Sequence, residues 1–396
     1  MSEFQASNFK KENGGTPNLV GKTELTSPYY FVPPSGTTAE RPQSCAPGTI
    51  RFNTDVGTLE VYRGDGIGWE YIEKREDQYL GGANATGSTS TSLQGSTVGT
   101  GARGLFGGSG DPASGREQIL YLTIPTTGNT LEFGSLTSQI YATAGLGSRT
   151  RGVFGGGYNP SQVNTMEFVT FSSRGSATDF GDTTYKARDM GGLSSSTRGL
   201  FFGGISTPGA PSGTNVINYI TISHTGNATD FGDAHAEVEG MEGLASSTRG
   251  LIMGGSNPSG GKNNISFVTI STTGNSADFG DMQASLHTFA TGSNATRGMI
   301  GGGRTPATAS GINNIQYVTI ATKGNAQDFG DLTVARSACD GVSDPTRFVV
   351  LGGYNPSNTN IIDFVNISST GYATDFGDSP YGRNRSGSCS NGHGGL

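Results

Sequence analysis

The sequence predicts an all-β fold: a β-propeller of six or seven four-stranded blades, preceded by an extended N-terminal arm and a small β-meander. Two observations lead to this prediction. A unit recurs six times at steps of 47 to 51 residues, which is typical of solenoids, propellers and arrays. In addition, 66 of the 396 residues are glycine and only 32% are hydrophobic, which favours many small sheets over one helical core.

The arm is expected to comprise residues 1–40. These residues are polar and contain Pro33-Pro34, with neither a helical nor an alternating pattern. Segments of this kind usually become ordered only on a partner.

The β-meander is expected to comprise residues 41–77. Short runs of β-prone residues, separated by turns rich in Gly, Asp and Asn, predict three strands. The runs are residues 49–52, 59–62 and 69–72. Trp69, the only tryptophan, is expected to fill the small core of this module.

Residues 78–396 contain the repeated units, and each unit predicts four strands. The first strand is small and polar, the second is an apolar run that ends in Gly-Gly, and the third alternates around an aromatic residue. A Thr-Gly-Asn turn leads to the fourth strand, which contains Asp-Phe-Gly-Asp. Four strands in a unit of this length are the pattern of a kelch-type propeller blade.

An arginine at the start of the second strand and a phenylalanine in the fourth mark every unit. The arginines are Arg103, Arg151, Arg198, Arg249, Arg297 and Arg347, and the phenylalanines are Phe133, Phe180, Phe231, Phe279, Phe329 and Phe376. We expect the arginines to tie neighbouring blades through hydrogen bonds to carbonyls or carboxylates, and the phenylalanines to lie between blades. Both sets are interpreted as structural.

The array must close or be capped, because a four-stranded sheet cannot bury both of its faces alone. Seven segments resemble the first strand, against six copies of the rest of the unit. They are residues 87–101, 142–147, 187–193, 238–244, 288–292, 336–342 and 385–392. The last segment either completes the first blade, giving six blades, or joins the strands of residues 49–72 in a seventh.

The Asp-Phe-Gly-Asp motif contains the triplet of the kinase metal-binding loop. No glycine-rich loop with a downstream lysine and no catalytic-loop aspartate accompany it, so a kinase is excluded. Two carboxylates alone supply too few oxygens for Ca²⁺, and the first copy reads Glu132-Phe133-Gly134-Ser135. The aspartates are expected to cap turn amides or to pair with the arginines, although the sequence leaves Ca²⁺ at these turns open.

No catalytic or metal site is predicted, and no cofactor is expected. The histidines lie at different phases of the repeat without the spacing of metal ligands; they are His224, His235, His287 and His393. A hydrolase would need acids that converge at the ring centre, where the first strands mostly offer Ser, Thr, Ala and Gly. Four acidic residues are exceptions, but they do not repeat in phase: Asp189, Glu237, Glu239 and Asp340.

Variable loops follow the Gly-Gly of the second strand. They contain Tyr-Asn-Pro at Tyr158 and Tyr354 and Arg-Thr-Pro at Arg304. Loops that vary on a fixed scaffold are where a propeller would bind a ligand. We therefore expect Tyr158, Arg304 and Tyr354 to be contact residues.

Charge and hydropathy exclude some partners. The formal net charge is -7 and charged residues make up 14% of the chain, so no polybasic surface indicates nucleic acid or anionic lipid. No apolar run approaches the length that crosses a bilayer, and residues 1–30 lack the apolar region of a signal peptide. We expect a protein made in a cytoplasm, without membrane insertion, whose three cysteines are free thiols.

Two parts of the chain resemble virion proteins of tailed bacteriophages. Residues 47–72 resemble a short module near the N-terminus of tail-fibre and related proteins. Residues 28–36 and the repeat together resemble proteins of marine phages, particularly those that infect cyanobacteria. The resemblance implies an N-terminal part that attaches to the particle, with contacts expected at Tyr29, Tyr30, Phe31 and Trp69, and repeats that face a host surface. The catalytic residues of depolymerising spikes have no counterpart here.

These features together predict a non-enzymatic virion structural protein of the tail-fibre type, assembled in the host cytoplasm. Its N-terminal part would dock to other tail or baseplate proteins, and its propeller would display loops for adhesion to surface carbohydrate. A homo-oligomer without nucleic acid is expected. The alternatives are a decoration or baseplate component without a receptor and, third, a glycan hydrolase on a propeller scaffold.

Overall fold

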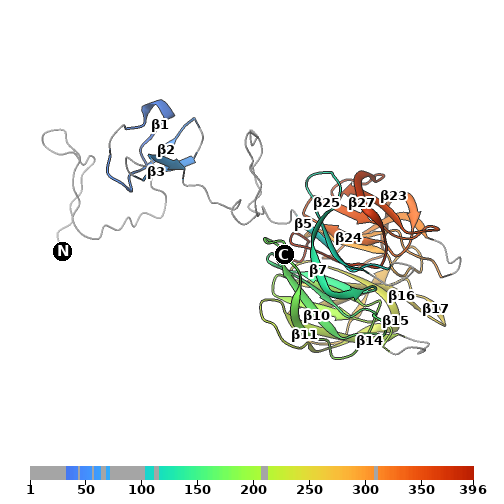
Figure 1. Ribbon diagram of the computed structural model, residues 1–396. Coiled ribbons are helices and arrows are strands. Elements are labelled where there is room, and N and C mark those ends of the chain that lie inside the picture. The colour runs from blue at the N-terminus through green and yellow to red at the C-terminus, as the bar shows by residue number, and fades with distance from the viewer. Residues whose placement is uncertain are drawn as a thin grey trace, which may run out of the picture. The chain divides into compact units, whose positions relative to one another are not determined.

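The computed structural model describes eight ranges of the chain, which are residues 33–42, 45–55, 58–63, 68–71, 103–110, 116–206, 213–306 and 311–396. The chain divides into two compact units, residues 1–79 and 80–396 (Figure 1). Within the described ranges every regular element is a β-strand, apart from one short 3-10 helix in the first unit. The expected all-β class is confirmed.

The first unit contains one small sheet with the strand order β1-β2-β3-β4. Its elements are β1 (Ser35–Gly36), the 3-10 helix η1 (Thr38–Glu40), β2 (Ile50–Asn53), β3 (Thr58–Tyr62) and β4 (Trp69–Tyr71). Strands β2 to β4 lie in the three runs from which the meander was expected, whereas β1 pairs with β2 in parallel.

The expected arm of residues 1–40 is wrong at its C-terminal end. The Pro34 carbonyl accepts a hydrogen bond from the Phe52 N–H at 2.7 Å, and the Gly36 carbonyl accepts one from the Thr54 N–H at 2.9 Å. Glu40 then accepts the Thr37 N–H at 2.8 Å, which caps η1. These bonds satisfy main-chain groups that an extended arm would leave to water, so residues 34–40 belong to the sheet.

The second unit consists of antiparallel sheets of four strands each, which we number from the N-terminus. Sheet 1 contains β28 (Gly387–Ser390), β5 (Arg103–Gly107), β6 (Arg116–Thr123) and β7 (Leu131–Ile140). Sheet 2 contains β8 (Ala144–Gly147), β9 (Arg151–Gly155), β10 (Thr165–Thr170) and β11 (Thr178–Asp182). Sheet 3 contains β12 (Gly191–Ser194), β13 (Arg198–Phe202), β14 (Thr214–Thr221) and the first part of β15 (Thr229–Ala245).

The remaining sheets repeat this arrangement. Sheet 4 contains the rest of β15, β16 (Arg249–Asn257) with its short partner β17 (Gly260–Gly261), β18 (Asn264–Thr269) and β19 (Ala277–Asp281). Sheet 5 contains β20 (Ala290–Ser293), β21 (Arg297–Gly301), β22 (Ile312–Thr319) and β23 (Gln327–Arg336). Sheet 6 contains β24 (Asp340–Ser343), β25 (Arg347–Leu351), β26 (Thr359–Asn366) and β27 (Thr374–Arg383). Because β15 serves two sheets, sheets 3 and 4 form one eight-stranded sheet.

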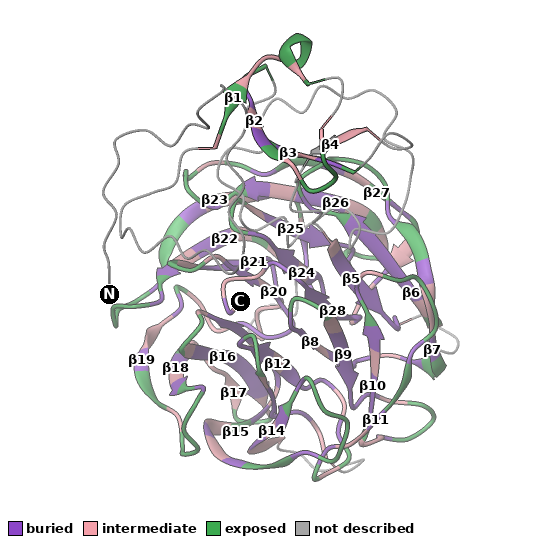
Figure 2. Cartoon of the chain, turned by 90° about the vertical axis from the view of Figure 1, so that its left-hand side faces the viewer, coloured by how far each residue is buried: buried purple, intermediate pink, exposed green. Residues whose placement is uncertain are grey.

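The innermost strands contact one another in a cyclic order. Strand β28 contacts β8, and contacts then follow in sequence through β12, β15, β20 and β24, which contacts β28 again (Figure 2). Strand β28 pairs antiparallel with β5, with Cys389 opposite Leu105. Of the two expected arrangements, residues 385–392 therefore adopt the one that completes the first sheet. The strands of residues 49–72 pair with β1 instead, so the composite seventh sheet is wrong.

The core lies between neighbouring sheets. Among the described residues, six apolar clusters each join two sheets. One of them joins sheet 6 to sheet 1, where Phe106 and Leu122 pack with Val349 and Phe376. Each sheet thereby buries both faces against its neighbours, which one sheet alone could not do.

A ring of main-chain hydrogen bonds encircles the centre. One residue just before or within each innermost strand has φ between 49° and 64°, and its N–H donates to the carbonyl of the corresponding residue in the preceding sheet at 2.8 to 3.1 Å. These residues, which we call the axial ring, are Ala142, Asp189, Gly240, Thr288, Ala338 and Arg385. Five of the six are not glycine, and left-handed backbone is uncommon for such residues. The closed cycle of bonds holds them there.

The arginines of the repeat connect sheets. The Nη1 of Arg198 in sheet 3 donates to the Ile270 carbonyl of sheet 4 at 2.9 Å, and its guanidinium lies 4.6 Å from the Tyr219 ring centroid. The other five make the corresponding bond, and the last, from Arg347 to the Ile124 carbonyl, joins sheet 6 to sheet 1. Each arginine also lies over the aromatic residue of the third strand in its own sheet.

The phenylalanines connect sheets through their main chain. Each ring is buried and meets the aromatic residue of the third strand edge-on in its own sheet. Each carbonyl accepts the N–H of a turn glycine in the next sheet, as Phe180 accepts Gly226 at 2.6 Å. The second aspartate of the motif donates its N–H to the turn asparagine in four of these contacts; the pairs are Asp182 with Asn227, Asp233 with Asn275, Asp281 with Asn325 and Asp378 with Asn129. Asparagine oxygens, rather than the expected aspartate side chains, accept these amides.

This contact predicts which glycines tolerate a side chain. Gly181 has φ of +137°, and a Cβ there would overlap the Gly226 carbonyl. We expect Gly181→Ala to lower the free energy of unfolding by about 1–3 kcal/mol, because the change adds backbone strain and a clash. Gly175 occupies the turn position facing sheet 1, and a Cβ there would meet nothing within 4 Å. Denaturant unfolding of both variants checks this: equal stability of Gly181→Ala and the matched control Gly175→Ala would contradict it.

Candidate functional site

Two further layers of residues lie next to the axial ring, on the side away from the central space between the innermost strands. The residue before each ring member forms one layer, which contains Tyr141, Arg188, Glu239, His287, Ser337 and Asn384. The residues that pair with these form the next layer, which contains Tyr158, Ile205, Ser256, Arg304, Tyr354 and Gly110. We call both layers and the axial ring together the mouth. Three residues expected from the sequence to contact a ligand, on sheets 2, 5 and 6, therefore lie in one layer of it.

An ion-pair cluster is built around Asp189 in the mouth. Its carboxylate is 4% exposed and lies 3.4 Å from the Nη1 of Arg188 and 3.3 Å from the Nη1 of Arg385. Arg188 precedes Asp189 in the chain, whereas Arg385 is the member of the axial ring that belongs to sheet 1. A buried carboxylate needs such partners, so two of the arginines in the mouth are committed to Asp189.

Arg304 has a different environment. Among the described residues, none forms a hydrogen bond or an ion pair with its guanidinium. Its main chain pairs with His287, with the Arg304 N–H donating to the His287 carbonyl at 3.0 Å. Burial, together with the charges of Arg304 and Arg385, lowers the pKa of His287 to about 4, so this imidazole is neutral near pH 7. Arg304 therefore faces no second cation at His287.

Glu239 is the second carboxylate of the mouth. Burial raises its pKa, and the neighbouring Asp189 charge raises it further, whereas Arg188, Arg385 and Arg304 oppose this shift. Glu239 is thus within electrostatic reach of all three arginines, yet no hydrogen bond holds its carboxylate among the described residues. The mouth combines three cations with two carboxylates.

Aromatic rings lie beside these charges. The Tyr141 and Tyr158 ring centroids are 5.3 Å apart, and the Arg188 guanidinium lies 5.7 Å from the centroid of Tyr158. Tyr354, in the equivalent position of sheet 6, is 49% exposed. Exposed aromatic faces next to planar polar groups suit ligands that are apolar on one side and polar on the other.

Two acids lie deeper, below the axial ring. Glu242 and Asp340 both line a cavity of about 30 Å³ directly under the ring and a cavity of about 90 Å³ between the innermost strands. Asp340 accepts the Ser386 N–H at 3.2 Å. Burial raises the pKa of Asp340 to about 7, and burial with the nearby Asp340 and Asp189 charges raises that of Glu242 well above its usual range.

The opposite end of this central space is filled by the C-terminal residues. The Nε2 of His393 lies 2.9 Å from the Gly147 carbonyl and 3.2 Å from the Ser194 hydroxyl. The Nη2 of Arg149 donates to the Leu396 carbonyl at 2.9 Å. Figure 2 shows the C-terminus among the innermost strands. C-terminal residues therefore occupy the end of the central space opposite the mouth.

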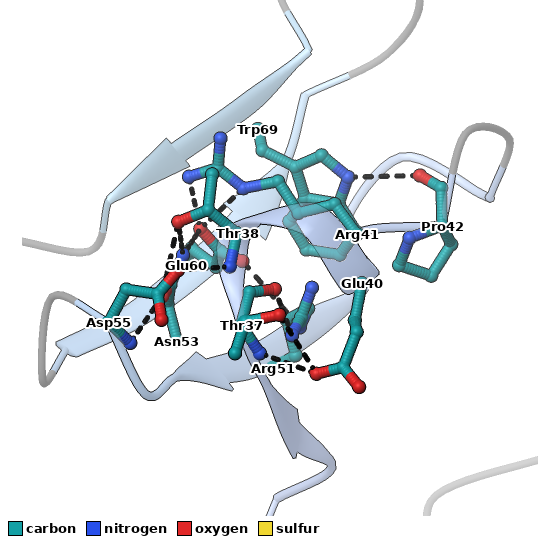
Figure 3. Close-up of polar contacts among 10 residues, drawn as sticks. All are labelled: Thr37, Thr38, Glu40, Arg41, Pro42, Arg51, Asn53, Asp55, Glu60 and Trp69. Carbon is teal, nitrogen blue, oxygen red and sulfur yellow. Dashed lines mark hydrogen bonds and ion pairs between the residues drawn. The ribbon is translucent and has the colours of Figure 1, made fainter.

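The first unit contains a buried polar network (Figure 3). Glu60 accepts hydrogen bonds from the Nη2 of Arg41 at 2.6 Å and from the Nδ2 of Asn53 at 3.1 Å. Burial opposes ionisation, yet these bonds hold the pKa of Glu60 below its usual value. Trp69 donates its indole N–H to the Pro42 carbonyl at 3.1 Å and lies 5.4 Å from the Tyr62 ring. This residue, expected to dock to the particle, thus makes contacts inside its own sheet.

The other face of this small sheet is apolar and exposed. Ile50 is 47% and Leu59 is 36% exposed, and the half-buried Phe52 and Val61 follow the same alternation. Tyr29, Tyr30 and Phe31, the other expected docking residues, lie outside the described residues. One face of the sheet therefore contains the buried polar network around Glu60, and the other face exposes apolar side chains.

Sequence reasoning found part of the mouth. Asp189, Glu239 and Asp340 were noted but set aside because they do not repeat in phase, and the structure places them near one axis on different sheets. Glu237 is exposed and lies outside the mouth. The contributions of Arg188 and Arg385 were missed and that of His287 was dismissed. An alignment of the first-strand segments on the residue with positive φ would have placed Arg188 and His287 in one layer and Arg385 in the adjacent axial ring.

The described ranges contain no metal site, no disulfide and no membrane-spanning helix. Within them, no group of three or more His, Cys, Asp or Glu side chains is placed to hold a metal ion. Cys339 and Cys389 are buried and unpaired, and Cys45 is unpaired as well. None of the helical structure described is long and apolar enough to cross a membrane.

The buried acid predicts a pH dependence of stability. Because the folded-state pKa of Asp340 is raised, the native state binds more protons than the unfolded state between about pH 4 and 7. Stability should therefore fall as pH rises through this range, by up to about 1.4 kcal/mol per pH unit for one proton. Asp340→Asn should reduce the slope and be more stable than wild type at pH 8. Thermal unfolding across pH checks this, and a variant with an unchanged slope would refute the assignment.

No protein-family model matches this chain, and no curated protein matches it.

Proposed function

We propose that residues 80–396 form a six-bladed, kelch-like β-propeller that serves as a non-enzymatic binding module, with the mouth as its binding face. The cyclic contacts of the innermost strands, the six inter-sheet clusters and the hydrogen-bonded axial ring support the closed propeller. The pairing of β28 with β5 supports closure of the first blade by the last strand.

The observation that carries the binding function is the convergence of Tyr158, Arg304 and Tyr354. They come from three separate sheets, yet they occupy the same layer around one axis. Polar and aromatic side chains presented on loops of a rigid scaffold are typical of binding sites. We propose surface carbohydrate as the ligand class, because sugars present both apolar ring faces and hydroxyl groups.

Catalysis within the central space is the less favoured alternative. Glu242 and Asp340 do converge there, as a hydrolase would require. The two cavities they line, of about 30 and 90 Å³, are smaller than the pockets of about 300 Å³ or more that hold small-molecule ligands. Burial raises the pKa of both acids. These features favour binding at the mouth.

We propose further that the protein is a homo-oligomeric structural component of a phage virion, attached to tail or baseplate proteins through its N-terminal part. The resemblance of residues 28–36, of residues 47–72 and of the repeat to such proteins motivates this role. The outward apolar face of Ile50 and Leu59 supports attachment, because exposed apolar patches commonly mark protein interfaces. A decoration or baseplate component without a receptor remains the second candidate.

Substitutions in the first unit test attachment. We expect the double change Ile50→Lys and Leu59→Lys to reduce incorporation into particles at least several-fold, since charges would have to be buried at the interface. Leu131→Lys, at a 54% exposed leucine of the second unit, is the matched control. Quantifying the protein in purified particles measures the effect, and normal incorporation of the double variant would argue against this face.

Substitutions in the mouth test binding. Tyr354→Ala should weaken binding of the full chain to its saccharide by about 1–3 kcal/mol, the scale of a lost aromatic contact. Tyr372→Ala, at a turn tyrosine that is 77% exposed, is the control and should bind normally. A glycan array with the intact protein gives the readout. A silent array, with the protein found buried inside the particle, would favour the purely structural alternative.

A further inference from the structure

The charges of the mouth are unbalanced in a chain that is acidic overall. The formal net charge of the whole chain is -7. Among the described residues of the mouth, three arginines, Arg188, Arg304 and Arg385, stand against two carboxylates, Asp189 and Glu239. Glu242 and Asp340 lie below the axial ring, where burial raises the pKa of both. His287 adds none near pH 7, because its pKa is about 4. The described side chains of the mouth therefore include more cations than carboxylates, unlike the chain as a whole.

The excess charge resides at Arg304. Asp189 lies between Arg188 and Arg385, so each of those two arginines has a carboxylate partner at its Nη1. The guanidinium of Arg304 has no such acceptor among the described residues. Its main chain is held to His287 by two hydrogen bonds, of 3.1 and 3.0 Å, so the base of the side chain is fixed before any ligand arrives. A planar guanidinium in this state suits a carboxylate, which it can bind through two parallel hydrogen bonds.

We infer that the mouth binds an acidic saccharide, with the sugar carboxylate on Arg304. This inference rests on the proposed saccharide-binding function and specifies its ligand. A single uncompensated charge matches a monoanion better than a phosphate ester, which carries nearly two negative charges near neutral pH. Tyr354 on the adjacent sheet offers an exposed ring face for the sugar. Glu239 and Asp189 disfavour a second anionic group.

The test compares matched sugars on the full-length protein. Calorimetric titration would use an oligosaccharide ending in glucuronic acid, its neutral glucose-terminated counterpart and the corresponding sulfate ester. We expect wild type to bind the acid about tenfold or more tightly than the neutral sugar, with an affinity that falls as salt is raised. Arg304→Met should remove this preference, so that the acid binds no more tightly than the neutral sugar, whereas Arg304→Lys should retain part of it.

Lys186→Met removes an exposed cation outside the mouth and is the control for overall charge. Equal melting temperatures of wild type and both Arg304 variants show that the fold is intact, and the lysine variant serves if the methionine variant is unstable. A wild type that binds neutral and acidic sugars equally overturns the inference while leaving the proposed function in place. Tighter binding of the sulfate ester overturns the carboxylate assignment. Failure of every sugar to bind overturns the inference and the proposed function together.

Discussion

Main-chain hydrogen bonds between neighbouring sheets are the constraint on which the second unit depends. They occur at two radii: the axial ring at the centre, and the contact between Asp-Phe-Gly-Asp and the turn glycine of the next sheet at the periphery. Both sets are cyclic and include the step from sheet 6 to sheet 1. Main-chain donors and acceptors are present whatever the side chain, so the spacing of the sheets is independent of the residues that vary in the mouth.

This independence explains how a repetitive scaffold presents a site without symmetry. The six positions next to the axial ring hold Tyr, Arg, Glu, His, Ser and Asn, although each precedes a ring residue with the same left-handed backbone. The repeated arginines and phenylalanines lie in the interfaces between sheets, where each sheet requires the same contact. The positions that differ therefore supply the residues of the proposed binding site, and the positions that recur supply the contacts between sheets.

The repeat made the strands and the inter-sheet role of Arg198 and its equivalents predictable, because each unit presents the same apolar pattern. Tyr158, Arg304 and Tyr354 could be proposed from the loops after Gly-Gly. The ion pair of Asp189 with Arg385 could not, since it joins residues 196 positions apart and depends on closure. The bonds of Pro34 and Gly36 with β2 were missed because a parallel pairing of two residues leaves no periodicity to detect.

Strand β5 is the point at which the chain from the first unit enters the ring. It lies second in its sheet, between β28 and β6, and is hydrogen-bonded on both sides. If the first unit is anchored and the mouth holds a ligand, tension between them acts on β5. The hydrogen bonds of β5 to β28 and to β6 must then break together, whereas those of an edge strand would break one at a time. Under such tension β28 would therefore resist removal of β5, in addition to completing sheet 1.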